Sequence, residues 1–502
     1  MVNSKFSINQ ISGEKYLIPK ILDDKYLIDS FLENHKGKKV VVVQGLGFVG
    51  AVMSLVCANA LNEEYAVIGV DLANENNYWK IKSINDGVFP VVASDPKIEE
   101  FFNISKKKGN FYATFDPYAY SKADVIIVDI NLDVQKETKF NGDLINYNVD
   151  LSNFEKAIKS ISDNCKEDFL LIVETTVPPG TCEKVVKPII EKGLKSRNFS
   201  QNKFKLGHSY ERVMPGPDYI DSIQNFYRVY SGINILSADS TELFLRTIIS
   251  TKKYPLTRLV NTNSTELSKV LENSYRAMNI AFVTEWSRFA EESEVNLYEV
   301  VDAIRMRPTH SNLMYPGIGV GGYCLTKDPL LASWAKQNHF NSNESLIQSE
   351  NGVKINDKMP LFAFDFMKRS FNLKSLSNMK ITFLGVSYRS NVGDTRYSPV
   401  EKLYNFCKKD DADITLHDPY VSFWEELNLK VSQDLFATIN QETDILIIST
   451  SHDEYKGSDT FIKKLLNKNK MMIFDTVGMF SQAEIDRLSI KHNLKVLGRG
   501  DL

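Results

Sequence analysis

The sequence predicts an α/β protein in which two doubly wound parallel-sheet domains are joined by a long central helix. Short apolar runs alternate with helical segments from Val40 to Val173, and a second series of the same kind begins near Lys380. Between them, one helical pattern continues from about Ser264 to Glu292. Because a short buried strand followed by a helix is the repeating unit of a parallel sheet, each series predicts one such sheet.

The length and composition limit the possible functions. A chain of 502 residues exceeds the usual size of one domain, and its hydrophobic share of 43% is normal for a soluble globular protein. The net charge is −3 with both signs interspersed, which argues against nucleic acid as a main partner. No apolar run approaches the length of a membrane span, so we expect no membrane association.

Cysteine and histidine usage indicates neither a metal site nor a disulfide framework. The five cysteines are widely spread and form no CxxC pair, and the seven histidines show no ligand spacing. We therefore expect no bound metal and a reducing, cytoplasmic location. The cysteines are Cys57, Cys165, Cys182, Cys324 and Cys407.

The first series of elements has a regular order. Strands are expected at Val40–Val43, Ala66–Val70, Val125–Val128 and Leu170–Val173, and a helix rich in small residues at Ala51–Leu61. The residues before about 39 form an extension with a helical pattern. The second series predicts strands at 381–384, 414–417, 445–449 and 472–474, with no complete GxGxxG loop. It is interpreted as a second nucleotide-binding-like sheet.

A glycine-rich loop directly follows the first strand, and an acid ends the second. Glycines at 45, 47 and 50 allow a tight turn, close approach of a pyrophosphate and packing of helix on strand. A carboxylate at Asp71 would bind a ribose hydroxyl and repel a 2′-phosphate, which favours NAD over NADP. The alternative is a glycine-rich turn with a capping aspartate. The predicted NAD-binding residues here are Gly45, Gly47, Phe48, Val49, Gly50 and Asp71.

The segment Gly319–Asp328 places Cys324 beside several glycines and four residues before a carboxylate. A thiol can hold an acyl group covalently, and a nearby acid can transfer protons. A nucleophilic sulfur and a hydride acceptor in one chain suggest oxidation of an alcohol past the aldehyde, through a thioester, to an acid. For the other four cysteines, a buried apolar role is the better interpretation.

Several further residues are open to two interpretations. Lys269 and Asn273 share one helix face and could stabilise a developing oxyanion, but from the residues alone a solvated surface pair is the stronger interpretation. The loop 174–181 is a ligand loop at a sheet edge or a proline-rich turn. Glu211 is a base or part of a surface ion pair. Arg396 precedes a helix start at Pro399 and could hold a phosphate or cap the helix.

Taken together, these motifs resemble the nucleotide-sugar 6-dehydrogenases of the UDP-glucose/GDP-mannose dehydrogenase family, from about Lys39 to near the C-terminus. The resemblance implies two Rossmann-like domains, a long helix that builds a homodimer, two NAD⁺ per sugar and no metal. It also implies a role in nucleotide-sugar metabolism and polysaccharide biosynthesis. The expected domains are an extension (1–38), an NAD-binding domain (39–260), a central dimerisation region with the cysteine loop (261–375) and a nucleotide-sugar-binding domain (376–502).

The resemblance also implies a role for each matching residue. Cys324 would attack the C6 aldehyde to give a thiohemiacetal, and a second oxidation would give the thioester. Lys269 and Asn273 would stabilise the charged oxygen, Asp328 would transfer protons through a water, and Glu211 would assist hydrolysis. Thr176 would lie near nicotinamide and sugar, and Arg396 near the cofactor. The implied substrate-binding residues are Glu211, Lys269, Asn273, His310, Gly321, Gly322 and Arg389.

This chain departs from the family pattern at three places. Arg389 stands where lysine is usual, His310 where arginine is common, and Asp129–Leu132 replaces a V-P-T-P segment. The motifs around 211–216 and 272–282 favour a UDP-N-acetylhexosamine, either UDP-GlcNAc or UDP-ManNAc, whereas Lys327 is typical of the UDP-glucose branch. UDP-glucose or GDP-mannose therefore remains an alternative substrate. More distant alternatives are a two-electron hydroxyacid dehydrogenase and a non-catalytic NAD-binding interaction protein.

Overall fold

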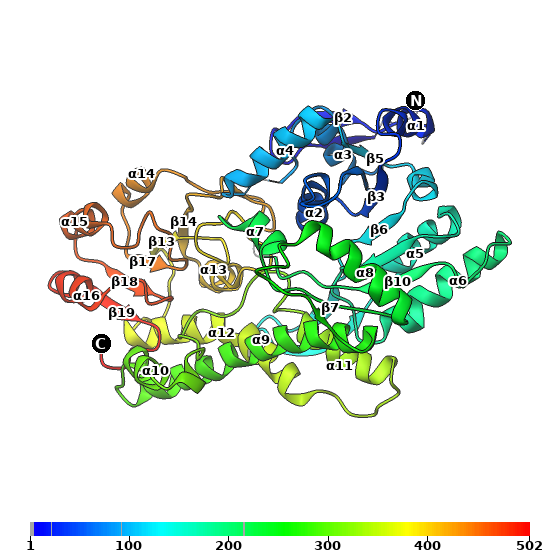
Figure 1. Cartoon of the computed structure of the whole chain (residues 1–502). Helices are drawn as coiled ribbons and strands as arrows, with labels where there is room; N and C mark the ends of the chain where they lie inside the picture. Colours follow the sequence, from blue (N-terminus) through cyan, green and yellow to red (C-terminus); the bar gives the residue numbers. More distant parts are fainter. Residues whose placement is uncertain (1–4, 22, 92, 214–215) are drawn as a thin grey trace. The chain divides into compact units, whose positions relative to one another are not determined.

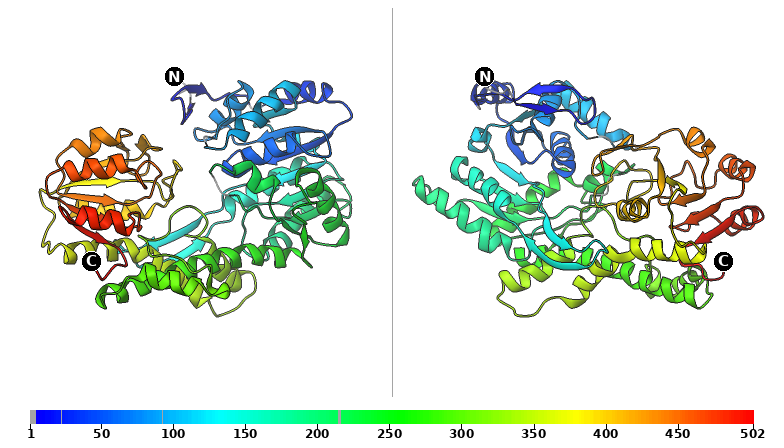
Figure 2. Two further views of the ribbon diagram at one scale, coloured as in Figure 1. Left: turned by 60° about the vertical axis from the view of Figure 1, so that its left-hand side comes forward. Right: turned by 180° about the vertical axis from the view of Figure 1, so that it is seen from behind.

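The computed structural model describes residues 5–21, 23–91, 93–213 and 216–502, and these fall into two compact units (Figures 1 and 2). Each unit contains one large sheet, mostly parallel in the first unit and wholly parallel in the second, so the predicted α/β fold with two doubly wound sheets is confirmed. The first unit consists of Met1–Asp133, Val149–Val270 and Trp334–Asn343, and the second of Val134–Asn148, Leu271–Ser333 and Glu344–Leu502.

The sheet of the first unit contains eight strands in the order β12-β11-β10-β9-β6-β3-β4-β5. Six of them are parallel in the doubly wound order 3-2-1-4-5-6, which places a topological switch point between β3 and β6. These six are β3 (Lys39–Gln44), β4 (Tyr65–Val70), β5 (Phe111–Thr114), β6 (Val125–Val128), β9 (Leu170–Val173) and β10 (Lys205–His208). β11 (Val229–Gly232) is antiparallel to β10, and β12 (Thr257–Arg258) is parallel to β11.

The strands predicted in the first unit are confirmed, with bounds that differ by at most one residue at either end. Their apolar runs are continuous because helices cover both faces of the sheet, and Val41, Val42 and Val43 are fully buried. The helices are α2 (Phe48–Ala58), α3 (Tyr78–Asn85), α4 (Pro96–Lys108), α5 (Ser152–Asn164), α6 (Lys187–Ser196), α7 (Tyr219–Gln224) and α8 (Ile235–Ile248). The expected helix at 51–61 corresponds to α2, which begins and ends three residues earlier.

The described part of the N-terminal extension packs on the rest of the first unit. Its predicted helical part is confirmed as α1 (Lys25–Glu33), which contacts β5 and the 3₁₀ helix η1 (Pro117–Ser121). Before α1, an antiparallel hairpin of β1 (Phe6–Ile8) and β2 (Lys15–Leu17) packs on α3. In Figure 1 this hairpin, in dark blue, lies beside α3. The sequence did not predict the hairpin, because each of its strands is only three residues long.

The sheet of the second unit is parallel throughout, in the order β14-β13-β17-β18-β19. Its strands are β13 (Lys380–Leu384), β14 (Asp413–His417), β17 (Ile445–Ile448), β18 (Met472–Asp475) and β19 (Asn493–Val496). The first four confirm the predicted series, and β19 adds a fifth strand that was not predicted. The flanking helices are α13 (Pro399–Lys409), α14 (Leu435–Asn440), α15 (Asp459–Asn467) and α16 (Gln482–Ser489).

The two sheets share the same turn after their first strand. Gly45 and Gly385 both adopt left-handed backbone angles, with φ of +98° and +92°, and each N–H donates to the last carbonyl of the second strand at 2.8 Å. The next residue, Asp71 in one unit and Asp418 in the other, accepts a hydrogen bond from the turn. The second sheet therefore reproduces the geometry of a nucleotide-binding turn without a complete GxGxxG sequence.

Long helices follow the first sheet. The predicted central helix is confirmed as α9 (Thr262–Glu292), whose first residues belong to the first unit and the remainder to the second. It is followed by α10 (Leu297–Arg305), the 3₁₀ helix η3 (Pro308–His310), α11 (Asp328–Asn338) and α12 (Ile347–Ser370). The second unit also contains the small strand pairs β7 (Val134–Thr138) with β8 (Leu144–Val149) and β15 (Phe423–Trp424) with β16 (Leu429–Lys430). Among the described residues, none of the helices has both the length and the apolar character needed to cross a membrane.

Candidate active site

The glycine loop of the first unit has the shape of a pyrophosphate cradle. A Cβ atom on Gly45 would lie 2.2 Å from the carbonyl oxygen of Asp129, and one on Gly50 would lie 1.9 Å from that of Gly45. Beside Gly47, by contrast, no atom of another described residue, apart from its chain neighbours and its own helix backbone, lies within 4 Å of such a position. Gly47 is also the N-cap of α2, where backbone N–H groups and the helix dipole favour an anion. The loop is therefore closed where it must turn and open where a pyrophosphate would approach.

Asp71 stabilises this loop from the end of β4. Its side chain is 8% exposed, and its two carboxylate oxygens accept hydrogen bonds from the N–H groups of Leu46 at 2.9 Å and Leu72 at 2.7 Å. Burial raises the pKa of the carboxyl above its ordinary value. Recognition of a ribose hydroxyl by Asp71 stays a prediction, and the structure adds that the same carboxylate fixes the glycine turn.

The loop after β9 presents Thr176 and anchors its neighbour. The Thr175 hydroxyl donates to the carbonyl of Val128 at 3.1 Å and accepts from the N–H of Ile130 at 2.8 Å, which joins the ends of β9 and β6. Thr176 is half-buried, on the carboxyl edge of the sheet. Before it, Glu174 forms a buried ion pair with Arg228. The interpretation as a rigid ligand loop fits this geometry better than a simple proline-rich turn.

Glu266 on α9 holds the second half of this loop. Its carboxylate accepts hydrogen bonds from the N–H groups of Gly180 at 2.6 Å and Cys182 at 2.8 Å, and it is fully buried. Burial raises its pKa to about 7, while the two N–H donors oppose the shift. Glu266 lies near the start of the helix predicted from Ser264, and no functional role was predicted for it from the sequence. Its partners, more than 80 positions away, could not be identified from local pattern.

Lys269 and Glu211 form a buried pair in the first unit. The Lys269 side chain is 6% exposed, its Nζ donates to the Glu211 carbonyl oxygen at 2.8 Å, and it lies 3.7 Å from Glu211 Oε1. The other carboxylate oxygen accepts from the N–H of Val213. The solvated surface interpretation is therefore wrong for Lys269. Residues 214–215 of the Glu-Arg-Val-Met-Pro-Gly motif lie outside the described residues.

In the second unit, Cys324 is exposed, whereas the other four cysteines are buried. Burial raises the thiol pKa of those four, which makes them poor nucleophiles near neutral pH. The Cys324 carbonyl accepts from the N–H groups of Lys327 at 3.2 Å and Asp328 at 2.9 Å, so this residue lies in the turn that begins α11. Accessibility thus distinguishes the predicted nucleophile from the other thiols of the chain.

A buried polar network lies next to Cys324. Asp328 is fully buried and accepts from Asn273 Nδ2 at 2.6 Å and from Lys327 Nζ at 2.7 Å. Lys327 is 4% exposed, and its ammonium also lies over the Tyr323 ring at 4.7 Å from the centroid. The structure therefore brings together Asn273 and Asp328, which are far apart in sequence. The sequence noted Lys327 only as a residue typical of the UDP-glucose branch and gave it no catalytic role.

The glycines before Cys324 lie against Tyr388. A Cβ atom on Gly321 would lie 2.4 Å from the Tyr388 Cβ, and one on Gly322 would lie 2.8 Å from its ring. Glycines beside Cys324 would be expected to leave room for a ligand, but Tyr388 fills the space into which side chains at these two positions would point. Substrate contact through their backbone stays a prediction. The Gly322 N–H also donates to the Arg396 carbonyl at 3.1 Å.

Arg396 lies in the turn that precedes α13. Its guanidinium forms a bidentate pair with the Asp394 carboxylate, at 2.9 and 2.7 Å. The expected helix start is confirmed, with Ser398 as N-cap and Pro399 in the first turn. Cofactor contact by Arg396 stays a prediction. Arg389 and His310 are both exposed, and the His310 ring is hydrogen-bonded to its neighbour, the Thr309 hydroxyl, at 2.8 Å.

Asp129, one of the departures from the family pattern, lies at the switch point of the first sheet. The residue is half-buried beside the glycine loop, and its Oδ2 atom is buried without a hydrogen-bond partner among the described residues. Burial raises its pKa to about 8, and the nearby charge of Glu211 acts in the same direction. The sequence showed only that residues 129–132 depart from the family pattern. It did not indicate that the Asp129 carboxyl would have a raised pKa.

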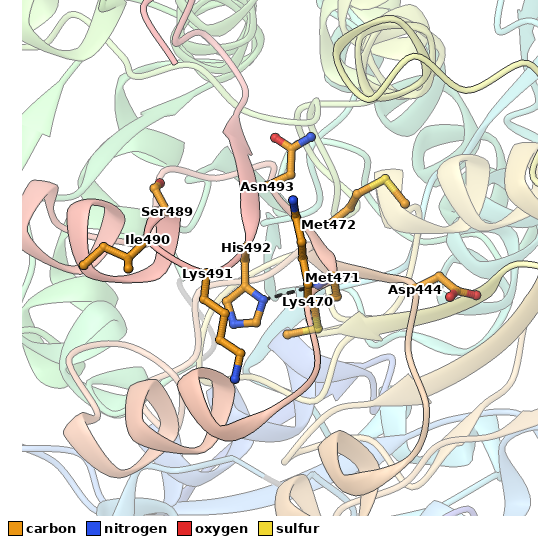
Figure 3. Close-up of a pocket in the computed structure, with 9 residues that line it drawn as sticks. All are labelled: Asp444, Lys470, Met471, Met472, Ser489, Ile490, Lys491, His492 and Asn493. Atoms are coloured by element: carbon orange, nitrogen blue, oxygen red, sulfur yellow. Dashed lines mark hydrogen bonds between the residues drawn. The ribbon is translucent and has the colours of Figure 1, made fainter.

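A pocket of about 540 Å³ in the second unit lies at the amino-terminal edge of the parallel sheet, opposite the edge where nucleotides bind (Figure 3). Its lining residues, among them Asp444, Met472 and Asn493, stand at the amino ends of the parallel strands. Gly385, Asp418 and the turn that leads to Arg396 lie at the carboxyl ends, where ligands bind in open parallel sheets. The pocket is therefore separate from the candidate site. Across the described part of the chain, no cluster of three or more metal-ligating His, Cys, Asp or Glu side chains is present.

Comparisons with known proteins agree with this geometry. Residues 38–235 match the NAD binding domain, 263–357 the central domain and 382–482 the UDP binding domain of the UDP-glucose/GDP-mannose dehydrogenase family. A UDP-N-acetyl-D-mannosamine dehydrogenase of Pyrococcus horikoshii is 30% identical over 422 residues, 83% of this chain and 90% of that protein. One from Methanocaldococcus jannaschii is 29% identical over 480 residues, 93% of this chain and 98% of that protein.

A solved structure of one of these relatives has the same fold. The solved structure of the Pyrococcus horikoshii UDP-D-ManNAc dehydrogenase superposes with a TM-score of 0.75 at 26% identity, and the match covers 92% of this chain and all of that one. Fold and glycine loop define an NAD-dependent oxidoreductase. The chain belongs to the UDP-glucose/GDP-mannose dehydrogenase family and is an NAD-dependent nucleotide-sugar dehydrogenase. The predicted family, enzyme class and cofactor are confirmed.

Proposed function

We propose that this enzyme oxidises the C6 alcohol of a UDP-N-acetylhexosamine, with UDP-ManNAc as first candidate, to the carboxylic acid in two steps through Cys324. The observation that carries the proposal is the exposed Cys324 thiol next to the buried network of Asn273, Asp328 and Lys327. A two-electron dehydrogenase has no need of a nucleophilic thiol. The four-electron reaction needs one, because the aldehyde must be held and oxidised again.

The chemistry requires one electron-pair acceptor for each oxidation, and NAD⁺ supplies it. After the first oxidation, the Cys324 sulfur adds to the aldehyde carbon, and the carbonyl π electrons move to oxygen to give a thiohemiacetal. Donors from Lys269 and Asn273 stabilise that oxygen. Loss of hydride from the same carbon restores the C=O bond as a thioester.

Hydrolysis then releases the acid and restores the thiol. A water molecule attacks the thioester carbonyl, the C–S bond breaks, and the sulfur recovers a proton. Asp328 is assigned to proton transfer through that water and Glu211 to its activation. Thr176 is assigned to nicotinamide and sugar, Asp71 to the adenosine ribose, and Arg396 to the cofactor. Arg389, His310 and the backbone of Gly321 and Gly322 are assigned to the substrate.

The choice of sugar is supported by the relatives. The proteins of Pyrococcus horikoshii and Methanocaldococcus jannaschii are UDP-N-acetyl-D-mannosamine dehydrogenases, and the matches span most of both chains. The motifs at 211–216 and 272–282 favour the same branch. UDP-GlcNAc is the second candidate, followed by UDP-glucose and GDP-mannose.

We also propose a cytoplasmic homodimer built on α9. Five large apolar side chains of this helix in the second unit are between 48% and 60% exposed, and their spacings of three, four and seven residues place them on one face. An apolar stripe of this kind marks an association surface, and a second copy of the chain offers the matching one. The residues are Leu271, Tyr275, Phe282, Trp286 and Phe289.

The test is to incubate the purified enzyme with NAD⁺ and each of UDP-ManNAc, UDP-GlcNAc, UDP-GalNAc, UDP-glucose and GDP-mannose. The proposal predicts two NADH and one uronic acid per sugar consumed, with the highest kcat/KM for UDP-ManNAc. One NADH per substrate would favour the two-electron hydroxyacid dehydrogenase. Tight NAD⁺ binding with no turnover of any of the five would favour a non-catalytic interaction protein.

A further inference from the structure

The N-terminal extension lies outside the family's NAD-binding region, which begins at residue 38. We propose that this extension is a positioning element of the dinucleotide site, and that it sets the affinity for the adenosine half of NAD by holding the segment that follows Asp71. The inference rests on the proposed assignment of Asp71 to the adenosine ribose. It is carried by two separate sets of hydrogen bonds, one to the segment that follows Asp71 and one to the neighbouring strand β5.

The first set comes from the hairpin. Ser7 is fully buried, and its hydroxyl donates to the Glu75 carbonyl at 2.8 Å and accepts from the Trp79 N–H at 3.0 Å. Two positions further, Asn9 is 3% exposed and donates to the Ser83 hydroxyl at 3.1 Å. Glu75 belongs to the short connection between β4 and α3, and Trp79 and Ser83 to α3 itself. The hairpin thus fixes the chain a few residues after Asp71.

The side chains of β1 face the opposite way from those of an ordinary edge strand. Phe6 and Ile8 point outward, 46% and 49% exposed, while the polar Ser7 between them points inward. A strand that only covered apolar surface would bury its large side chains and expose the serine. Apolar packing therefore does not explain this strand, whereas the two hydrogen bonds of Ser7 do.

The second set comes from the start of α1. The Asp24 carboxylate accepts from the hydroxyl groups of Tyr112 at 2.8 Å and Thr114 at 2.7 Å, and the Asp24 N–H donates to Asp116 Oδ2 at 2.8 Å. Tyr112 and Thr114 belong to β5, the edge strand beside β4. The Thr114 carbonyl in turn accepts the N–H of Asp71 at 3.1 Å.

The extension therefore holds both supports of Asp71: the strand end that binds its N–H, and the segment that follows it. Between these supports, the connection Leu72–Asn77 is only partly buried, and Leu72 is 60% exposed. A binding residue gains affinity when its backbone is already in the bound position, because less conformational entropy is lost on binding. Removing one support should weaken adenosine binding without affecting the nucleotide of the sugar substrate.

The experiment measures binding of two probes by calorimetry to the full-length enzyme: ADP-ribose for the adenosine half of NAD, and UDP for the sugar nucleotide. Ser7→Ala removes only the hydroxyl, and with it both hydrogen bonds, without adding volume at this buried position, so ADP-ribose should bind about tenfold more weakly with UDP unchanged. Asn9→Ala should give a smaller loss of the same kind, and Ser7→Thr, which keeps the hydroxyl, should restore affinity. Tyr26→Ser is the matched control, since this α1 side chain is 82% exposed.

In turnover, Ser7→Ala should raise KM for NAD⁺ and leave KM for the sugar nucleotide unchanged. Equal ADP-ribose affinity in all variants would overturn the inference while leaving the proposed function intact. So would parallel losses of ADP-ribose and UDP binding with a lower thermal midpoint, which would indicate a merely structural role. If the unaltered enzyme bound no ADP-ribose, the proposed NAD site itself would be wrong, and the inference with it.

Discussion

Removal of the Lys327 ammonium gives the sharpest test of the network beside Cys324. Its Nζ lies 2.7 Å from Asp328 Oδ1, and the two side chains are 4% and 0% exposed. Lys327→Met keeps the stem and leaves the carboxylate with only the Asn273 amide among these partners. Breaking one side of a buried ion pair costs about 3–5 kcal/mol, so the free energy of unfolding of the second unit should fall by about 3 kcal/mol or more.

The measurement is urea unfolding followed by tryptophan fluorescence, in a double-mutant cycle with Asp328→Asn. The double variant contains no buried charge at this site, so it should recover a large part of the loss, with a coupling energy of about 2 kcal/mol. The matched control is Lys463→Met in the exposed Lys463–Asp459 pair of α15, which should cost less than about 1 kcal/mol. Equal effects of the two lysine substitutions would refute the account of this network.

Three further predictions concern other parts of the chain. Gly47→Val should leave the thermal midpoint unchanged but weaken NAD⁺ binding more than about 100-fold, whereas Gly45→Ala should destabilise the fold itself, since its Cβ would meet the Asp129 carbonyl. Because burial raises the pKa of Asp129 to about 8, the protein is stabilised at low pH and loses that stability as pH rises. Urea unfolding at pH 5 and pH 8 should show a loss of stability that is smaller in Asp129→Asn, by up to about 4 kcal/mol, than in the unaltered protein. Trp286→Asp on the exposed stripe of α9 should convert the dimer to monomer in sedimentation velocity, and an unchanged dimer would exclude this face as the interface.

The sequence predicted most of the fold because local signals and architecture agree. Continuous valine and isoleucine runs occur in strands that are buried on both faces, and the glycine loop sits between a strand and a helix, so β3, β4, β6 and β9 were placed to within one residue. The N-terminal hairpin was not predicted. Its strands have three residues each, and the inward side chain of β1 is Ser7 rather than an apolar residue, so it carries no pattern to detect.

Within the site, chemistry that depends on one residue was easier to predict than chemistry that depends on distant partners. Cys324 was recognised from its neighbours, and its exposure agrees with that prediction. Burial of Lys269, and the contacts of Glu266 with Gly180 and Cys182, follow from tertiary packing. The space beside Gly321 could not be judged from sequence either, because Tyr388, which fills it, comes from a different loop.

The most direct measurement is mass spectrometry of the enzyme after rapid acid quench during turnover of UDP-ManNAc with NAD⁺. The account predicts an acyl adduct on the peptide that contains Cys324, absent from Cys324→Ser, together with loss of uronic acid formation in that variant. Undiminished acid production by Cys324→Ser, with no adduct in the unaltered enzyme, would contradict the central claim.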